Sequence, residues 1–545
     1  MNFSKLFFPV LALAAAACSE RPAVEADYQT VPLPENISLS ADAAAFKFNP
    51  KTRIVATDSA QAVNAGLFAG YVNTLTGFSP EITDKAPANN YIRLKSTLGG
   101  DNADAYTITV NADSIVVDGA TPAATFYGLQ TLRKAIPGTG KHDVLYPAGT
   151  VTDSPRFAYR GAHFDTSRHF FSPDSVKMFI DMIALHNINR FHWHITDDQG
   201  WRLEIKGLPE LTEKGSVRTG TIIGKTEEYD SIPYGGFYTQ DDVRDIVKYA
   251  ADRHITVIPE IDLPGHMQAA LASYPELGCT GGPYEVWRRW GVSDNVLCAG
   301  NDSVYTFLDK VMDEVTELFP SEYIHIGGDE CPKKHWEECP KCQAKIKSLG
   351  LKSDSHSTAE QKLQSHVMTH VAEYLAKKGR KVIGWDEILE GGVDTSTVIM
   401  SWRGTQGGIA AAQAGHDAIM TPNQYMYFDF RQADEGEPIA ANWGDALPLE
   451  KVYSYEPIPD EFTPEQAAHI IGVQANLWCE YIPNYRQAEY MEMPRIGALA
   501  EVQWTKGPKD FDAFMKRIER LTKIYDAEGY NYRKAYFETQ AETAE

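Results

Sequence analysis

The sequence predicts an α/β protein in which a (β/α)8 TIM barrel is preceded by a small α+β N-terminal domain. Three observations predict this architecture. Short apolar segments alternate with amphipathic helical segments eight times after residue 156. Acidic, histidine and tryptophan residues recur where these apolar segments end. No glycine-rich dinucleotide or phosphate motif follows an early strand, which counts against the alternative fold, a doubly wound open sheet.

The composition is that of a large, acidic globular protein. The chain has 545 residues, of which 43% are hydrophobic and 23% are charged, so it can bury a sizeable core. Its 51 basic and 74 acidic residues give a formal net charge of −23. Such a charge argues against nucleic acid or anionic lipid as a partner. The 10 Trp and 27 Tyr could offer flat faces to sugars, although core packing accounts for most of them.

The first 18 residues resemble an export signal. One lysine precedes an apolar run from Leu6 to Ala17, which is shorter than the roughly 20 residues that a bilayer requires. The run ends in Ala15-Ala16-Ala17-Cys18, as in a bacterial lipoprotein signal. We therefore expect a lipid anchor on Cys18 and a location in the periplasm or on the outer membrane or cell surface of a bacterium. The alternative is cleavage at an Ala-x-Ala site and release.

Residues 19–155 form the predicted α+β domain. The segments 91–96, 105–111 and 114–119 have the apolar pattern of short strands. Residues 120–136 predict a helix, because Thr121 can cap it and Pro122 suits its first turn. The Pro-rich stretch 146–157 marks the boundary, after which we expect the barrel over 156–535 and a polar tail over 536–545.

The barrel prediction rests on eight strand candidates and the helices between them. The strands are expected at 159–166, 190–196, 255–262, 323–328, 381–385, 397–402, 417–422 and 470–478. The helices are expected at 173–186, 241–253, 304–319, 360–378 and 490–500, with a last helix at 511–528. This alternation is typical of a barrel with long loops.

The cysteines that follow the signal leave two interpretations open. Export permits disulfides, and Cys279 and Cys298 bracket a Gly/Trp-rich loop as plausible partners. Cys331, Cys339 and Cys342 form a tighter group, in which Cys339-x-x-Cys342 could supply half of a zinc site. A second Cys-x-x-Cys or a paired His motif is missing. We therefore favour a local disulfide and expect neither a metal nor a cofactor.

Polar and aromatic residues mark the ends of the predicted strands, where barrel active sites lie. They are Asp197, Asp198, Glu260, Asp262, His266, Asp329, Glu330, Trp385, Asp386, Glu387, Trp402, Arg403, Tyr425, Tyr427, Asp429, Trp478 and Glu480. Acidic residues generally favour loops. That preference could explain acidic residues at one or two strand ends, but it explains their presence at nearly all strand ends less easily.

Two adjacent carboxylates, Asp329 and Glu330, follow the fourth strand. Gly327 and Gly328 can break the strand and turn both side chains toward the barrel mouth. Neighbouring residues still lie on the same side of any ligand. A glycosidase with a protein nucleophile needs its second carboxylate about 5–5.5 Å from the acid and on the other face of the sugar. Asp329 is badly placed for that role.

A nucleophile on the substrate would explain the adjacent pair. In a sugar with a 2-acetamido group, the carbonyl oxygen can attack the anomeric carbon from the face opposite Glu330 and form an oxazolinium ion. Glu330 would then act as general acid and later as base. Asp329 would accept the amide N–H and stabilise the positive charge. This route retains configuration.

These residues occur in motifs that resemble the β-N-acetylhexosaminidases of glycoside hydrolase family 20. The motifs are "RGAHFDTSRHFF", "FHWHITDDQGWRLEI", "PEIDLPGH", "HIGGDE", "GWDEI" and "GVQANLWCE". The resemblance covers nearly the whole chain after the signal. It implies a catalytic (β/α)8 barrel behind a small α+β domain. It also implies an exo-acting, retaining enzyme that removes terminal β-linked GlcNAc or GalNAc from oligosaccharides or glycoconjugates, such as chitin fragments or other glycans.

The resemblance also implies a role for individual residues. Glu330 resembles the general acid/base and Asp329 the acetamido-orienting residue. Arg160 resembles the arginine that binds the 3- and 4-hydroxyls, for which a guanidinium suits because it offers several donors. The other implied substrate-binding residues are Glu480 at the 4-hydroxyl, Asp429 at the 6-hydroxyl, Tyr427 at the acetamido carbonyl, Trp385, Trp402 and Trp478 as an aromatic wall, and Asp197 and His266, which tune the Asp329-Glu330 pair from behind.

Two other functions remain as alternatives. A surface glycan-binding protein on the same scaffold would have lost catalysis, but such a protein has no need of Glu330. A metal-dependent amidohydrolase barrel would need histidine ligands at several strand ends. Only His192 and His194 approach that pattern, and hydrogen-bonded histidines lining the barrel explain them more simply.

Overall fold

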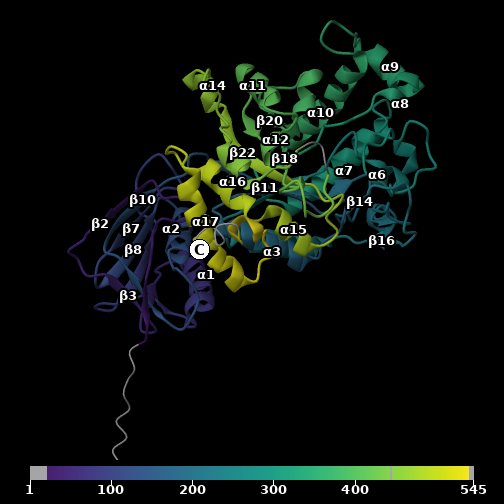
Figure 1. Cartoon of the computed structure of the whole chain (residues 1–545). Coiled ribbons are helices and arrows are strands. Elements are labelled where there is room, and N and C mark those ends of the chain that lie inside the picture. Colours follow the sequence, from purple (N-terminus) through teal and green to yellow (C-terminus); the bar gives the residue numbers. More distant parts are fainter. Residues whose placement is uncertain (1–20, 442–444, 539–545) are drawn as a thin grey trace, which may run out of the picture.

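The computed structural model describes residues 21–441 and 445–538 (Figure 1). The expected signal over residues 1–18, with Cys18, lies outside the described residues. Within the described part of the chain, no helix is long and apolar enough to cross a membrane.

The N-terminal domain consists of two sheets and two helices. The larger sheet has the strand order β2 (Asn36–Leu39), β10 (Gly149–Asp153), β7 (Tyr106–Val110), β8 (Ser114–Gly119), β6 (Tyr91–Lys95), β4 (Arg53–Val55) and β5 (Glu81–Thr83). The smaller sheet pairs β1 (Ala23–Glu25), β9 (Asp143–Tyr146) and β3 (Phe46–Phe48). The helices are α1 (Ser59–Thr76) and α2 (Pro122–Lys134). As expected, α2 begins at Pro122, and the hydroxyl of Thr121 accepts a hydrogen bond from the N–H of Ala124 at 3.2 Å.

Eight parallel strands close the barrel, each at a position that the sequence predicted. They are β11 (Tyr159–Asp165), β12 (Arg190–His194), β17 (Thr256–Glu260), β18 (Tyr323–His325), β19 (Lys381–Trp385), β20 (Val398–Ser401), β21 (Ala418–Met420) and β22 (Ile470–Leu477), which pairs with β11. Nearly all of their residues are buried, as expected for parallel strands that helices cover. The (β/α)8 prediction is confirmed.

Most predicted helices are also present. They are α3 (Pro173–Leu185), α5 (Gln240–Ala251), α7 (Asp302–Leu318), α10 (Ala359–Lys377) and α17 (Phe511–Glu528). The single helix expected at 490–500 is wrong. Two helices, α15 (Tyr485–Glu492) and α16 (Arg495–Trp504), meet there at Met493-Pro494, because proline lacks the N–H that would continue α15.

The polar tail expected at 536–545 is partly corrected. Its first residues belong to the short helix α18 (Ala535–Glu538). The hydroxyl of Tyr536 accepts a hydrogen bond from the N–H of Leu449 at 3.0 Å, so this helix is attached to the barrel domain. Residues 539–545 lie outside the described residues.

The two domains are joined by buried polar contacts. The indole N–H of Trp504 donates to Asp153 at 2.9 Å, and Arg133 pairs with Glu528 at 2.8 Å. In Figure 1 the C-terminal helix α17 lies beside α1 of the N-terminal domain. The contacts place the N-terminal domain against α16 and α17, away from the mouth of the barrel.

Candidate active site

A cavity of about 270 Å³ opens at the C-terminal ends of the barrel strands. Eight of the residues that the sequence proposed line it: Asp329, Glu330, Trp385, Trp402, Tyr427, Asp429, Trp478 and Glu480. They come from the ends of β18 to β22 and the loops that follow. The position agrees with the general rule for barrel active sites.

The backbone after β18 is bent so that two neighbouring carboxylates reach the same cavity. Gly327 and Gly328 have φ values of 61° and 102°, and Glu330 has a φ of 42°. A Cβ at Gly327 would lie 1.7 Å from a carboxylate oxygen of Asp262, so no larger residue fits. A non-glycine residue with positive φ is held in a strained conformation, and such strain clusters at functional sites.

His266 shows that both carboxylates lie on one side of the cavity. Its Nε2 is 3.8 Å from Oδ2 of Asp329 and 3.6 Å from Oε2 of Glu330. Its Nδ1 is 3.2 Å from Oδ1 of Asp197. Both His266 and Asp197 are buried and lie behind the carboxylate pair. This position agrees with the expectation that they act on the substrate site through the Asp329-Glu330 pair.

Burial and neighbouring charges perturb the titration of this region. Burial, followed by the Asp262 carboxylate, raises the pKa of Asp329 well above its usual value. Burial raises the pKa of Asp262 to about 8. Burial alone would lower the pKa of His266, but the Asp197 carboxylate outweighs it and holds that pKa well above 6.5. A cationic His266 thus faces the two pocket carboxylates.

Three buried carboxylate oxygens in the cavity have no hydrogen-bond donor among the described residues. They are Oδ1 of Asp329, Oδ1 of Asp429 and Oε2 of Glu480. A buried acceptor without a donor costs about 1–3 kcal/mol. Burial raises the pKa of both Asp429 and Glu480. These oxygens are therefore suited to receive N–H or O–H groups from a ligand.

The arginine of the site is Arg168, and the prediction of Arg160 is wrong. Arg160 is at the start of β11, is 1% exposed, and pairs with Asp104 of the N-terminal domain at 2.9 Å. Arg168 follows the other end of that strand and lines the cavity. Its guanidinium lies 2.8 Å from Asp197 and 3.8 Å from Glu480. A guanidinium held in this way keeps a fixed orientation toward a ligand.

Aromatic side chains form a large part of the cavity wall. The rings of Trp402 and Tyr427 are stacked at 6.1 Å and 13°, and those of Trp385 and Trp478 are 5.8 Å apart. The indole N–H of Trp385 donates to Glu260 at 2.7 Å, and that of Trp402 donates to Glu387 at 2.9 Å. Hydrogen bonds thus fix the orientation of two of these rings.

The two histidines of β12 belong to a polar network inside the barrel. The side-chain amide of Gln474 donates to Nδ1 of His192 at 2.9 Å, and Nε2 of His192 lies 3.1 Å from Glu260. His194 bridges Glu260 and Asp197, the latter at 2.9 Å. These contacts agree with the expectation of hydrogen-bonded histidines that line the barrel.

Sequence reasoning missed part of the cavity wall. Trp290, Gly291, Val292, Ala441 and Tyr481 also line the cavity. Trp290 to Val292 belong to the irregular segment between η1 (Pro275–Leu277) and α7, which has no periodic pattern to place it. Arg168, in contrast, could have been found, because it follows the C-terminal end of its strand.

Comparison with known proteins decides the family. The model of the glycosyl hydrolase family 20 catalytic domain matches residues 157–507, and that of the family's domain 2 matches residues 27–154. The chain belongs to glycosyl hydrolase family 20. It is a glycoside hydrolase of the β-hexosaminidase type.

Similar proteins of this family include both sequences and structures. A β-hexosaminidase of Porphyromonas gingivalis is 41% identical over 95% of this chain and 67% of its own length. The family 20 exo β-N-acetylglucosaminidase of Vibrio harveyi, solved in complex with N-acetylglucosamine, is 33% identical with a TM-score of 0.81, covering 95% of this chain and 80% of that one. A mutant β-hexosaminidase of Streptomyces plicatus, in complex with the product GlcNAc, is 28% identical with a TM-score of 0.79, covering 93% and 96%.

The corrected arginine of this family 20 chain gives a first prediction. Arg168→Gln should lower kcat/KM by about 10²-fold, because a charged hydrogen bond to the ligand contributes about 1.5–3 kcal/mol. Arg160→Gln should instead lower the stability of the protein by about 3 kcal/mol, since it removes the partner of Asp104 and the donors to the carbonyls of Phe157 and Asn187. Kinetics and thermal unfolding of both variants check this. A larger kinetic loss in Arg160→Gln than in Arg168→Gln would contradict the correction.

Proposed function

We propose that the protein is an exo-acting, retaining β-N-acetylhexosaminidase in which the 2-acetamido group of the substrate is the nucleophile. One observation carries the proposal: Asp329 and Glu330 lie on the same side of the cavity, beside one nitrogen of His266. A protein nucleophile would have to attack from the face opposite the acid.

The proposed reaction has two steps. Glu330 donates its proton to the glycosidic oxygen while the acetamido carbonyl oxygen forms a bond to the anomeric carbon, and the aglycone leaves as an alcohol. In the second step Glu330 takes a proton from water, and the water oxygen opens the oxazolinium ring at the anomeric carbon. Two inversions at this carbon retain its configuration.

Asp329 has a supporting role in both steps. Its Oδ1 is buried and has no donor among the described residues, so it can accept the acetamido N–H. This bond orients the carbonyl oxygen for attack. The carboxylate also stabilises the positive charge that develops on the oxazolinium ion, as preorganised charges do in low-dielectric sites.

The cavity is suited to one terminal sugar. Its volume of about 270 Å³ lies near the lower end of the range for small-molecule pockets. Arg168 can donate to ring hydroxyls, and the free oxygens of Glu480 and Asp429 can accept from them. Tyr427 and the three tryptophans of the wall supply apolar faces for the acetamido methyl and the ring. Terminal β-linked GlcNAc or GalNAc on an oligosaccharide or glycoconjugate meets these requirements.

Paired substrates test the proposal. The purified protein is incubated with nitrophenyl β-N-acetylglucosaminide and with nitrophenyl β-glucoside. Rapid hydrolysis of the first alone supports the proposal, because only that sugar has the acetamido group. Hydrolysis of both at similar rates would require a protein nucleophile. Binding of N-acetylglucosamine without hydrolysis of either substrate would favour the alternative, a glycan-binding protein on the same scaffold.

The carboxyl group of Asp262 predicts a pH effect. Its charge raises the pKa of Asp329, as do Glu260 and Glu330, whereas His266 lowers it. The proposed route needs ionised Asp329, so kcat/KM should fall as the pH drops through this raised pKa. Asp262→Asn removes a neighbouring group whose ionisation competes with that of Asp329, and it should move the acidic limb of the profile to lower pH. An acidic limb that stays at the same pH or moves to higher pH would contradict the role assigned to Asp329.

We also infer that the protein acts outside the cytoplasm, attached to a membrane through a lipid on Cys18. Support comes from the apolar run and the small residues that precede this cysteine. Cys18→Ser should release the protein from the membrane fraction of the producing cell. Unchanged fractionation would contradict the anchor.

A further inference from the structure

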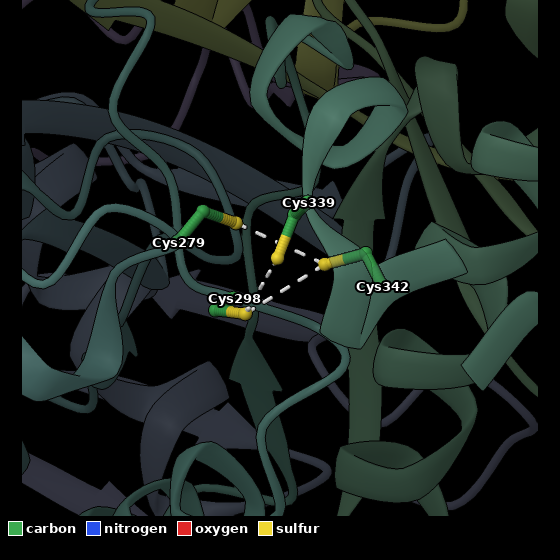
Figure 2. Close-up of side chains that lie close together, drawn as sticks. All are labelled: Cys279, Cys298, Cys339 and Cys342. Carbon is green, nitrogen blue, oxygen red and sulfur yellow. Dashed lines mark hydrogen bonds between the residues drawn. The ribbon is translucent and has the colours of Figure 1, made fainter. Parts of the chain in front are cut away.

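Four cysteines from three separate segments form one cluster outside the active site. Cys279 follows η1, Cys298 precedes α7, and Cys339 and Cys342 stand at the start of α9 (Pro340–Leu349). Figure 2 shows the four side chains directed toward a common centre. All four are free thiols, so the disulfide expected from the sequence is not formed here. Cys331, which the sequence grouped with Cys339 and Cys342, is not a member of the cluster.

The spacing of the sulfur atoms fits a tetrahedral metal ion. Zinc–thiolate bonds are about 2.3 Å long, and the edge of a tetrahedron with that radius is about 3.8 Å. The Sγ atoms of Cys298 and Cys339 are 3.7 Å apart, as are those of Cys298 and Cys342. The Sγ atoms of Cys279 and Cys342 are 3.8 Å apart. All four sulfur atoms lie within 4.8 Å of one another.

The cluster is enclosed by its surroundings. Cys298 and Cys342 are fully buried, Cys339 is nearly so, and only Cys279 is partly exposed. The loop after Cys298 passes against the first turn of α9, where a Cβ at Gly300 would lie 2.3 Å from the backbone nitrogen of Cys342. Glycine is therefore required for this close approach.

We propose that Cys279, Cys298, Cys339 and Cys342 bind one zinc ion in a closed, structural site. Zinc with four thiolates and no open position is typical of structural sites, whereas catalytic zinc keeps a position for water. Cys339-x-x-Cys342 is one common ligand pair of such sites. The second pair is separated by a long loop, which explains why the sequence pattern did not reveal it.

The zinc site would tether part of the active-site cavity wall to the rest of the barrel domain. Cys279 and Cys298 bracket the loop that carries Trp290 and Val292 to the cavity. At the base of this loop, the N–H of Cys298 donates to the carbonyl of Leu277 at 2.8 Å. Cys339 and Cys342 belong to the segment that follows Glu330. One zinc ion would therefore link the loop to the segment that follows the carboxylate pair.

Two disulfides are the competing state, because export is expected and oxidising compartments favour them. Cys279 with Cys342 and Cys298 with Cys339 would be the natural pairs. Each pair of sulfur atoms would have to approach from the observed 3.7–3.8 Å to about 2.05 Å. The number of free thiols separates this state from the zinc site.

The experiment measures metal and thiols on the same purified wild-type protein. Elemental analysis should find about one zinc ion per chain. Alkylation in denaturant with EDTA, without a reductant, should label all four cluster cysteines in the peptide map. An organomercurial should release the zinc in solution, and chelation should lower Tm. Absence of zinc together with unlabelled cluster cysteines would overturn the proposal, and so would iron in place of zinc.

Matched variants locate the metal. Cys298→Ser and Cys342→Ser should lose most of the zinc after dialysis against EDTA, whereas Cys331→Ala and Cys479→Ala should keep it. The last two are also buried free thiols, so they control for the loss of any buried cysteine. Equal zinc loss in both sets would overturn the assignment. If the first set fails to fold, the metal and thiol measurements on the wild-type protein still decide the question.

Discussion

Asp329→Asn should lower kcat by about 10²–10³-fold, the usual effect of removing one preorganised electrostatic group. The amide is nearly the same size as the carboxylate but carries no negative charge. It therefore cannot stabilise the oxazolinium ion, and its NH2 group can point toward the acetamido N–H. Turnover of nitrophenyl β-N-acetylglucosaminide measures the effect, and near-normal turnover would rule out the acetamido-orienting role.

The stability of the same variant should change in the opposite direction. Burial raises the pKa of Asp329 in the folded protein. When the pKa of a carboxyl group is higher in the folded than in the unfolded protein, the folded state becomes less stable as the pH rises from the unfolded pKa to the folded pKa. At neutral pH the ionised side chain is thus destabilising, and Asp329→Asn should unfold at the same or a higher temperature than wild type. The exposed Asp42, which lies in a turn, gives the control Asp42→Asn, for which neither kcat nor Tm should change.

Glu330→Gln should lower kcat/KM by about 10²–10⁴-fold for substrates with a poor leaving group, because a general acid contributes about that much. The loss should shrink as the leaving group improves. A dinitrophenolate can leave without being protonated, whereas an alkoxide leaving group needs a proton from the acid. The slope of log kcat/KM against the pKa of the leaving group should therefore be steeper for the variant than for wild type.

Asp329→Asn is the matched comparison for this series. It removes charge stabilisation but keeps the acid, so its loss should depend much less on the leaving group. A uniform loss for Glu330→Gln across all leaving groups would mean that Glu330 is not the acid. A steep slope for Asp329→Asn would mean that the two roles are exchanged.

The sequence predicted most of the barrel because strand alternation and strand ends are local signals. The eight apolar segments were all strands, and the residues at their ends lie together because parallel strands of a barrel end at the same face. The helix expected at 490–500 failed on a local feature, Pro494, which separates α15 from α16.

The two remaining errors differ in origin. Arg160 and Arg168 lie at opposite ends of the same strand, and the rule that barrel sites lie at the C-terminal strand ends would have selected Arg168. Arg160 at the N-terminal end pairs with the N-terminal domain. The thiol cluster was missed because Cys279 and Cys298 reach Cys339 and Cys342 only through the fold of two loops. Nothing in the spacing of those residues along the chain predicts that contact.

The central claim is that the acetamido oxygen attacks the anomeric carbon, and its nucleophilicity can be changed on the substrate. Nitrophenyl glycosides bearing acetyl, monofluoroacetyl, difluoroacetyl and trifluoroacetyl groups at the 2-amino position form such a series. Inhibition by the matching free sugars controls for the fit of each acyl group in the cavity. If the substrate supplies the nucleophile, kcat/KM should fall steeply with each added fluorine, while the inhibition constants change little. A kcat/KM that stays nearly constant across the series would contradict the account, because it would mean that the protein supplies the nucleophile.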